Sequence, residues 1–469
     1  MVAGALAGVA VLAACSREKA AIPGSGGPPR HVFLITVDTL RGDHVSFDGY
    51  GRATTPALAR LAAQGVVFEH AYCQWPKTGT SFASMFTGRY PQSTGLMHRA
   101  TIRIPAEYLS LPQLFQGAGY RTVGVVSNPV LGTDLGWNNG FDDFAETWGG
   151  GQFPDDPHAF RPLVHAGRVN SLALPLLEKH RADDRLFVWI HYSDPHAPYV
   201  LPAGTTNPFV GDRLYTQDEK LRKHQLRGYA LDGPLELRFY VSQYDANVLV
   251  VDRAVDQLLA KARELGLLDD ALIVFTADHG ESLGEHGSYF EHGPLPYNTT
   301  AHVPLFVVRT GAPIAAGRRV ERPVELVDLF PTLRDLVAPQ RTVDGLEGRS
   351  LVPFLGGPST PGPDAFRYAF SEAGEPPRHY RMVQDGEWKL IYEPGVERRQ
   401  RADIPGGLEL YDLTSDPGET RNLASQETEQ VRRLRRELLS WMKTTQPKVA
   451  PEGEDEESLR ALRALGYVK

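Results

Sequence analysis

Residues His31 to Asp38 read HVFLITVD, seven mostly apolar residues followed by an aspartate. A continuous apolar run of this length is typical of a strand buried on both faces, as in a parallel sheet. A carboxylate directly after such a strand lies at the carboxyl edge of the sheet, where open α/β sheets build their sites. The stretch therefore predicts a buried parallel strand that delivers Asp38 to a functional site.

Similar apolar runs recur along the chain and alternate with helical patterns. The further predicted strands are VVFEHA from Val66, YRTVGVVS from Tyr120, LFVWIHY from Leu186, ALIVFTAD from Ala271 and VPLFVV from Val303. Thr55-Pro56 is a helix-start signal, and a long amphipathic helix covers roughly Leu235 to Leu265. Strands that alternate with helices predict an α/β fold, with a large, mostly parallel central sheet covered by helices on both faces.

The composition divides the chain into three parts. We expect a signal and tether at 1–30, a catalytic domain at 31–355 and a C-terminal subdomain at 356–469. The linker GGPSTPGPD opens the last part, and EWKLIYE and LELYDL within it are typical of a small antiparallel sheet. A charged helix follows near Glu427 to Lys443. The C-terminal subdomain is therefore predicted to be a small sheet plus a helix.

The overall composition is that of a globular protein. The chain has 469 residues, of which 42% are hydrophobic and 23% are charged. Its net charge of -8 is spread along the chain, which argues against nucleic acid as a partner. Residues 136–185 and 197–234 are rich in glycine, proline and polar side chains. We expect them to be long excursions that form the walls of a substrate cleft.

The first fifteen residues, MVAGALAGVAVLAAC, are apolar, uncharged and too short to span a bilayer. They are typical of a secretory signal, and Leu12-Ala13-Ala14-Cys15 matches the bacterial lipobox, whose cysteine is lipidated. We therefore expect an exported, bacterial membrane-anchored lipoprotein that is periplasmic or on the cell surface. The alternative is a plain signal peptide with a chance cysteine. The second cysteine, Cys73, is expected to be a buried structural thiol.

Acidic and imidazole side chains follow three of the predicted strands. Such groups at the carboxyl ends of strands suit a divalent ion such as zinc, manganese or calcium. A single aspartate there often caps a loop, and a lone histidine often satisfies a hydrogen bond, but three groups on three buried strands favour a metal site. They are Asp38 after the first strand, His191, Asp194 and His196 in HYSDPHAPY, and Asp278 and His279 in TADHGESLGEHG.

Longer stretches match a known family in their order along the chain. They are VDTLRGDHVSFDGYGRATTPALARLAAQGVVFEHAY, TGRYPQSTG, HYSDPHAPY, YDANVLVVDRAVDQLL, DHGESLGEHG, VELVDLFPTL and LYDLTSDPGETRNL. Over about residues 31–425 the chain resembles the sulfatase family of the alkaline-phosphatase-like superfamily. The resemblance implies the alkaline-phosphatase-like fold and metal-dependent hydrolysis of anionic esters.

The resemblance places Thr78 at the position of the nucleophile. In sulfatases the motif is Cys/Ser-x-Pro/Ala-x-Arg, and its first residue is converted to formylglycine. Counting back from Thr87-Gly88 puts Thr78 first, with Thr80 in place of the proline and Phe82 in place of the arginine. A threonine cannot become formylglycine, so water would have to cleave a covalent intermediate at phosphorus or sulfur. Superfamily members with threonine here are phosphodiesterases, pyrophosphatases and phosphoglycerol or phosphoethanolamine transferases, which favours phosphoryl transfer.

The resemblance also implies a first metal site formed by Asp38, Thr78, Asp278 and His279. A divalent ion bound to the Thr78 hydroxyl would lower its pKa and make it a better nucleophile. Thr78 precedes the apolar helical turn TSFASMFTG, so the start of a helix is expected to face the anionic ester.

A second metal site is an open alternative. Asp194, His196 and His292 follow in the order of the ligands in two-zinc relatives, although the Asp-x-His spacing is shorter than the usual Asp-x-x-x-His. We favour the other interpretation, in which His196 and His292 are catalytic residues that contact the substrate or the leaving group. The sequence therefore leaves open whether one ion or two are bound.

Together these patterns predict a phosphoric (di)ester hydrolase or phospho-group transferase with Thr78 as its nucleophile. Its substrate would be a small-molecule, lipid or polysaccharide anionic ester, and its lipid anchor would hold it at a membrane. One rival is a sulfuric ester hydrolase that works without formylglycine. The rival of another class is a non-catalytic binding protein on a sulfatase scaffold, against which the group of Asp38, Asp278 and His279 speaks.

Overall fold

A computed structural model describes the chain from residue 27 to residue 445. Within that range it leaves out 98–101, 149–163, 213, 215–218, 223–224, 226–233, 313, 357–364, 376–377 and 394–406. The predicted signal, the lipidation candidate Cys15 and the last residues of the C-terminal part lie outside the described residues.

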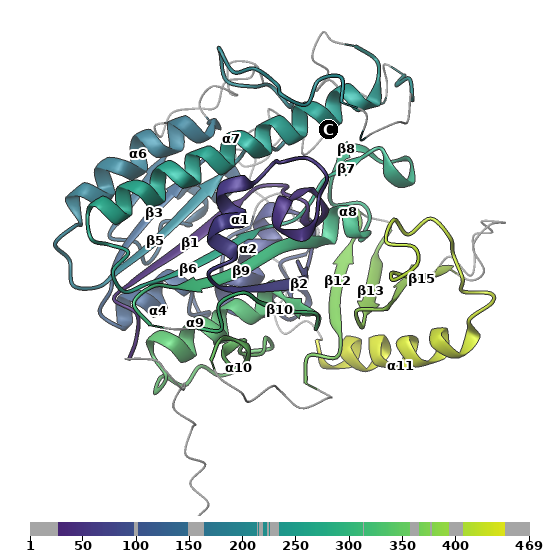
Figure 1. Ribbon diagram of the computed structural model, residues 1–469. Coiled ribbons are helices and arrows are strands. Elements are labelled where there is room, and N and C mark those ends of the chain that lie inside the picture. Colours follow the sequence, from purple (N-terminus) through teal and green to yellow (C-terminus); the bar gives the residue numbers. More distant parts are fainter. Residues whose placement is uncertain are drawn as a thin grey trace, which may run out of the picture.

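The main sheet is mixed but mostly parallel, in the order β10-β2-β9-β6-β1-β5-β3-β4, with β11 beside β2 (Figure 1). Only β9 runs antiparallel to its neighbours, β2 and β6, among the described strands of this sheet. The strands are β1 (His31–Val37), β2 (Val66–Tyr72), β3 (Arg121–Val126), β4 (Asp143–Glu146), β5 (Leu186–Tyr192), β6 (Ala271–Ala277), β9 (His302–Arg309), β10 (Arg318–Val320) and β11 (Val324–Glu325). The predicted sheet is confirmed.

The central position of β1 explains why its sequence is apolar throughout. The strand pairs in parallel with β5 on one side and with β6 on the other, and all seven of its residues are buried. A strand with neighbours on both edges and helices over both faces has no side that meets water, so alternation of polar and apolar residues gives no advantage.

Two groups of helices cover the two faces of this sheet (Figure 1). One group is α1 (Pro56–Ala62), α6 (Ala166–Lys179) and α7 (Leu237–Glu264). The other is α2 (Thr78–Thr87), α4 (Leu111–Gly117), α9 (Leu329–Val337) and α10 (Val352–Leu355). Shorter elements are α3 (Pro91–Thr94), α8 (Asn298–Ala301), the strands β7 (Ser282–Leu283) and β8 (Tyr289–Glu291), and the 3-10 turns η1 (Gly42–His44), η2 (Ser46–Asp48), η3 (Pro129–Leu131), η4 (Thr133–Leu135), η6 (Glu285–Gly287) and η7 (Leu326–Asp328).

The C-terminal part forms a second, antiparallel sheet with a helix against one face, as predicted. Its strands are β12 (Ala369–Ala373), β13 (Tyr380–Gln384), β14 (Trp388–Tyr392) and β15 (Leu408–Asp412), and the helix is α11 (Thr428–Thr444). Leu434, Leu438 and Trp441 are the buried residues of this otherwise charged helix. Their spacing of four and three places them on one face, which packs on the small sheet.

One prediction about the course of the chain is wrong in part. Residues 136–185 are not simply an excursion, because β4 adds an edge strand to the main sheet and α6 packs against β3 and β5. Val169, Ala173 and Leu177 recur every four residues and give α6 its buried face. Pro175 inside this helix and the glycines before it hid the pattern, since both residue types ordinarily mark the end of a helix.

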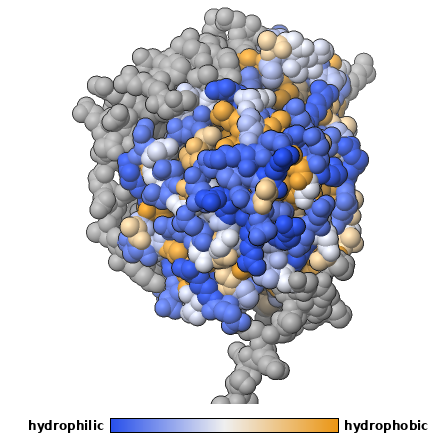
Figure 2. All heavy atoms as spheres, turned by 90° about the vertical axis from the view of Figure 1, so that its left-hand side faces the viewer, coloured by the Kyte–Doolittle hydropathy of each residue, from blue (hydrophilic) through white to orange (hydrophobic). Residues whose placement is uncertain are grey.

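The outer surface is largely polar where Figure 2 shows it. On the face that lies to the left in Figure 1, most described atoms belong to hydrophilic residues, and hydrophobic residues form small separate areas. None of the helices in the described parts of the chain is both long and apolar enough to cross a membrane.

Candidate active site

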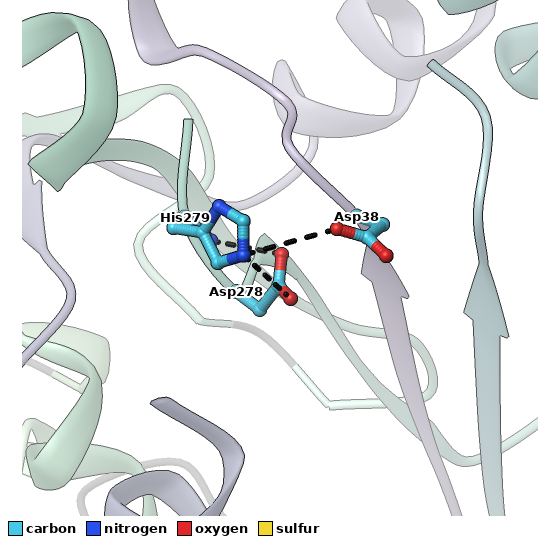
Figure 3. A group of neighbouring side chains, drawn as sticks. All are labelled: Asp38, Asp278 and His279. Atoms are coloured by element: carbon cyan, nitrogen blue, oxygen red, sulfur yellow. Dashed lines mark hydrogen bonds and ion pairs between the residues drawn. The ribbon is translucent and has the colours of Figure 1, made fainter. Parts of the chain in front are cut away.

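The register of the main sheet brings two aspartates together at its carboxyl edge. Val37 at the end of β1 is paired with Ala277 at the end of β6, so Asp38 and Asp278 follow side by side. His279 comes next, and the three side chains point toward one another (Figure 3). One ligand atom of each lies within 4.8 Å of the others. Among the described residues this is the one such group of three, and all its members are fully buried.

The donor atoms of this group fit a divalent cation. Oδ1 of Asp38 and Oδ2 of Asp278 are buried without a hydrogen-bond partner, and they lie 3.9 Å and 3.4 Å from Nε2 of His279. The Nδ1–H of His279 donates to the Gly280 carbonyl at 2.9 Å, so Nε2 carries the lone pair. Two carboxylate oxygens and an imidazole lone pair are ligands that zinc and manganese accept.

The pKa shifts within the metal-free group are those of a site that lacks a cation. Burial and the negative charge of Asp38 hold the pKa of Asp278 well above its ordinary value. Burial would also raise the pKa of Asp38, but the imidazoles of His196, His191 and His279 outweigh it and lower that pKa. Burial lowers the pKa of His279 well below its ordinary value and keeps the ring neutral. A cation between the three side chains would favour both ionised carboxylates and the neutral imidazole.

Thr78 lies beside this group, at the first residue of α2. Its Oγ1 is 3.2 Å from Nε2 of His279, and the residue is only 2% exposed. Ser81, one turn later, donates its hydroxyl to the Asp278 carbonyl at 2.7 Å, which fixes the start of the helix against the end of β6. The first N–H groups of a helix have no partner within the helix, so they can stabilise an anion bound at Thr78.

The residue at the position of the sulfatase arginine serves the core. Phe82 is fully buried, and its ring centroid lies 5.0 Å from that of His191 and 5.2 Å from that of Trp189. Cys73 is buried and not bonded to another cysteine, as expected for a structural thiol. Phe82 carries no charge in place of the arginine, and Cys73 lies five residues before the position of the nucleophile.

Two further residues lie against Asp38: Asn128, which has no role in the sequence analysis, and His191, which is one of the imidazole groups predicted at the strand ends. Asn128, directly after β3, donates its Nδ2–H to Oδ2 of Asp38 at 2.6 Å. Nε2 of His191, near the end of β5, lies 3.8 Å from the same oxygen. Asn128 follows a predicted strand, and His191 lies near the end of another. Because parallel strands place their sites at the carboxyl edge of the sheet, Asn128 could have been predicted as a site residue.

The two predicted catalytic histidines lie close to each other and to the cation group. The ring centroid of His292 is 4.3 Å from that of His279 and 5.3 Å from that of His196. His196 donates its Nδ1–H to the Ala197 carbonyl at 2.6 Å, which fixes its ring. Both histidines therefore lie near His279, whose Nε2 is 3.2 Å from the Thr78 hydroxyl.

Asp194 is not assembled with them in a second group of three ligands. Its Oδ1 lies 2.9 Å from Nδ1 of His165, and its Oδ2 accepts the Ala166 N–H at 2.7 Å. Both carboxylate oxygens thus bind the start of α6, and this contact fixes that helix to the end of β5. The second metal site stays a prediction that this geometry does not favour.

The C-terminal part reaches the rim of the site. The Gly374 N–H, just after β12, donates to the Gly293 carbonyl at 2.8 Å. Nζ of Lys77, next to Thr78, forms an ion pair with Glu375 at 3.1 Å. The chain around His292 is therefore held between the main sheet and the small one.

Known proteins with similar sequences include both sulfatases and a multifunctional member of the alkaline phosphatase superfamily. A "Sulfatase" of Formosa agariphila is 25% identical over 475 residues, which cover 90% of this chain and 88% of the relative. The "Multifunctional alkaline phosphatase superfamily protein PehA" of Trinickia caryophylli is 26% identical and covers 88% of this chain and 95% of its own.

Solved structures with the same fold also come from both groups. The phosphonate monoester hydrolase SpPMH of Silicibacter pomeroyi superposes with a TM-score of 0.68 at 22% identity, over 89% of this chain and 96% of its own. A 2-O GAG sulfatase reaches the same TM-score at 20% identity, over 89% of this chain and 92% of its own. At these identities the structures show the alkaline-phosphatase-like fold alone.

Family models match along most of the described chain. The model of the sulfatases matches residues 30–338. A model described as "N-sulphoglucosamine sulphohydrolase, C-terminal" matches residues 284–447, across the small sheet and α11. The first match alone covers more than half of the chain and contains every side chain of the cation group. The chain belongs to the sulfatase family, whose members hydrolyse sulfate or phosphonate esters.

Proposed function

We propose that this hydrolase acts on phosphoric diesters, or transfers a phospho group, with Thr78 as its nucleophile. The observation that carries the proposal is the hydroxyl of Thr78, buried at the start of α2 and 3.2 Å from Nε2 of His279. A formylglycine hydrate has two hydroxyls and can release sulfate by collapsing to the aldehyde. Threonine has one hydroxyl and a β-methyl group, so its ester must be cleaved by water at the central atom.

The side chains of the site divide the work of such a reaction. Asp38, Asp278 and His279 would hold a divalent ion, which supplies a lower hydroxyl pKa and offsets negative charge when it is bound. The N–H groups at the start of α2 stabilise the non-bridging oxygens of the ester. Asn128 keeps Asp38 in place, and His292 or His196 exchanges a proton with the leaving group.

A comparison of two chromogenic esters tests the proposal. We expect purified protein loaded with zinc or manganese to hydrolyse bis(4-nitrophenyl) phosphate faster than 4-nitrophenyl sulfate. Thr78→Ala is expected to abolish both activities. Thr87→Ala, at the far end of the same helix, is the matched control, because its hydroxyl donates to the Ala83 carbonyl within the helix. Full activity of Thr78→Ala would exclude the proposed nucleophile.

A sulfuric ester hydrolase without formylglycine is the second candidate. It is favoured by the family itself and by the sulfatases among the relatives. It would use the same side chains, so only the preferred ester differs. Faster turnover of the sulfate ester, with loss of that activity in Thr78→Ala, would establish it. Protein that binds metal but cleaves neither ester would support the binding-protein alternative.

We also propose that the chain is exported and lipidated on Cys15, which confines the site to an extracytoplasmic membrane face. Support comes from the apolar run that ends in Leu12-Ala13-Ala14-Cys15. Metabolic labelling with an alkyne fatty acid tests this: the label is expected on the full chain and not on Cys15→Ala. Anionic esters of lipids, polysaccharides or small molecules are the substrate classes that such a position makes accessible.

A further inference from the structure

A short hairpin follows the cation group and places a glutamate opposite a histidine. The strands β7 and β8 are antiparallel, with Ser282 paired to Glu291. In an antiparallel pair the next residues outward also face each other, and here they are Glu281 and His292. The hairpin starts at Ser282, three residues after His279, so its first strand follows closely on the cation group.

The two side chains are in contact and shielded from water. Oε1 of Glu281 lies 2.9 Å from Nδ1 of His292, and their side chains are 0% and 8% exposed. The Glu281 carbonyl accepts a hydrogen bond from the buried Arg41 guanidinium at 3.2 Å, which fixes the backbone at this point. The contact of the buried Glu281 carboxylate with Nδ1 restricts the rotation of the imidazole ring.

Glu281 itself is not one of the three side chains that could share a cation. Its partner His292 has its ring against that of His279, with 4.3 Å between the centroids. The buried glutamate therefore acts on the site through His292.

We propose that Glu281 is the positioning residue of a carboxylate–imidazole pair in which His292 exchanges a proton with the leaving group. The inference rests on the proposed function. Glu281 engages Nδ1, so the proton exchanged with the substrate is the one on Nε2. Such a contact sets which ring nitrogen is available and where it points.

The reaction balances with one exchangeable proton on Nε2. In the first half, the Thr78 oxygen, after giving its proton to solvent, forms a bond to phosphorus. The bond from phosphorus to the leaving oxygen breaks, and that oxygen takes the proton from Nε2. In the second half, a water oxygen attacks phosphorus, Nε2 takes a proton from that water, and the Thr78 oxygen departs. The proton between Nδ1 and Oε1 stays within the pair.

The leaving group provides the test, because a good leaving group needs no proton and a poor one does. Methyl 4-nitrophenyl phosphate and methyl phenyl phosphate differ only in this respect. We expect Glu281→Gln and His292→Asn to lose at least about tenfold more activity on the phenyl ester than on the nitrophenyl ester, within the usual range of general acid catalysis. Glu281→Asp, which keeps the carboxylate, should recover part of the difference.

Two controls separate this role from a structural one. Glu291→Gln changes a carboxylate on the same hairpin that accepts a hydrogen bond from Ser288 at 3.0 Å, and should leave the ratio of the two activities unchanged. In metal-free protein labelled with 15N-histidine, Glu281→Gln should shift the His292 Nδ1 resonance, whereas Glu291→Gln should not.

The outcomes distinguish the pair from the proposed function. Equal losses of activity on both esters in Glu281→Gln, or an unchanged His292 Nδ1 resonance, would overturn the positioning role of Glu281. The proposed function would still stand. If the wild type cleaves only aryl sulfates, the phosphoric preference fails, and 4-nitrophenyl and phenyl sulfate then test the pair in the same way. A wild type that cleaves neither class of ester overturns both.

Discussion

Replacing Asp278 by asparagine should stabilise the metal-free protein and make its stability independent of metal. Oδ1 of Asp278 accepts the N–H groups of Thr39 at 3.2 Å and of His279 at 2.8 Å. The asparagine carbonyl oxygen can keep both hydrogen bonds. Its amide nitrogen would replace Oδ2. This oxygen has no hydrogen-bond partner and lies 3.4 Å from Nε2 of His279. The substitution thus places a hydrogen-bond donor where Oδ2, an acceptor, now faces Nε2 of His279, which is also an acceptor.

The size of the effect follows from the separation of the charges. Ligand atoms of Asp38 and Asp278 lie within 4.8 Å of each other. Two negative charges at that distance repel by about 3.5 kcal/mol at an effective dielectric constant of about 20. Burial and Asp38 raise the pKa of Asp278, and protonation relieves part of this repulsion in the wild type. We therefore expect a gain of roughly 1 to 3 kcal/mol, or about 1 to 3 °C in Tm for a chain of this length.

Thermal unfolding of chelator-treated protein, with and without added zinc or manganese, measures both effects. Without metal, Asp278→Asn should melt above the wild type. With metal at about 1,000 times its Kd, the wild type should gain about 4.1 kcal/mol, and the variant should gain almost nothing. The order of the two melting temperatures should therefore reverse.

Asp252→Asn is the matched control for this experiment. Asp252 is also a buried carboxylate that accepts two backbone N–H groups, from Ala57 at 3.0 Å and Leu58 at 2.8 Å, but it belongs to α7 and caps the start of α1. This control should keep the full response to metal. A metal-free Asp278→Asn that melts below the wild type, or one that still gains stability from metal, would refute the electrostatic reasoning.

Three other predictions concern single residues. Thr78→Ala should lower kcat/KM for the preferred ester by at least about 10³-fold, because it removes the nucleophile. Thr78→Ser keeps a hydroxyl and should keep measurable turnover. Steady-state kinetics on metal-loaded protein measures both. Cys73 should not react with iodoacetamide in the native protein, because burial raises the pKa of its thiol, and peptide mass spectrometry before and after unfolding checks it. Burial lowers the pKa of His302 from 6.5 to about 4, so the unfolded chain binds more protons between these values and stability should fall as the pH drops through this window. His302→Gln, whose amide can still donate to the Glu69 carbonyl, should flatten that fall in urea unfolding at pH 7 and pH 5.

The main sheet could be predicted because its buried strands carry their pattern locally. HVFLITV needs no information from elsewhere to be recognised as β1, and the carboxyl-edge rule then points to Asp38. Elements without such a local pattern depend on contacts between residues that are far apart in the sequence. Pro175 and the nearby glycines obscured α6, whose role is set by its packing on β3 and β5.

The site residues could likewise be predicted only where a local sequence pattern marks them. Asp278 and His279 share one strand end with each other, and their position beside Asp38 follows from the register of β1 and β6. Asp194 had the right residue type and order, but its partners, His165 and Ala166, are nearly thirty residues away and have no motif. Residue types alone could not show that these contacts occupy both of its oxygens.

A covalent ester on the Thr78 oxygen can be trapped and located. Metal-loaded protein turning over methyl 4-nitrophenyl phosphate is quenched in acid within the first turnover, and its peptides are mapped by mass spectrometry. The mechanism predicts a burst of 4-nitrophenol together with a methyl phosphate ester on the Thr78 oxygen. A burst with the ester on another residue, or with unmodified Thr78, would contradict it.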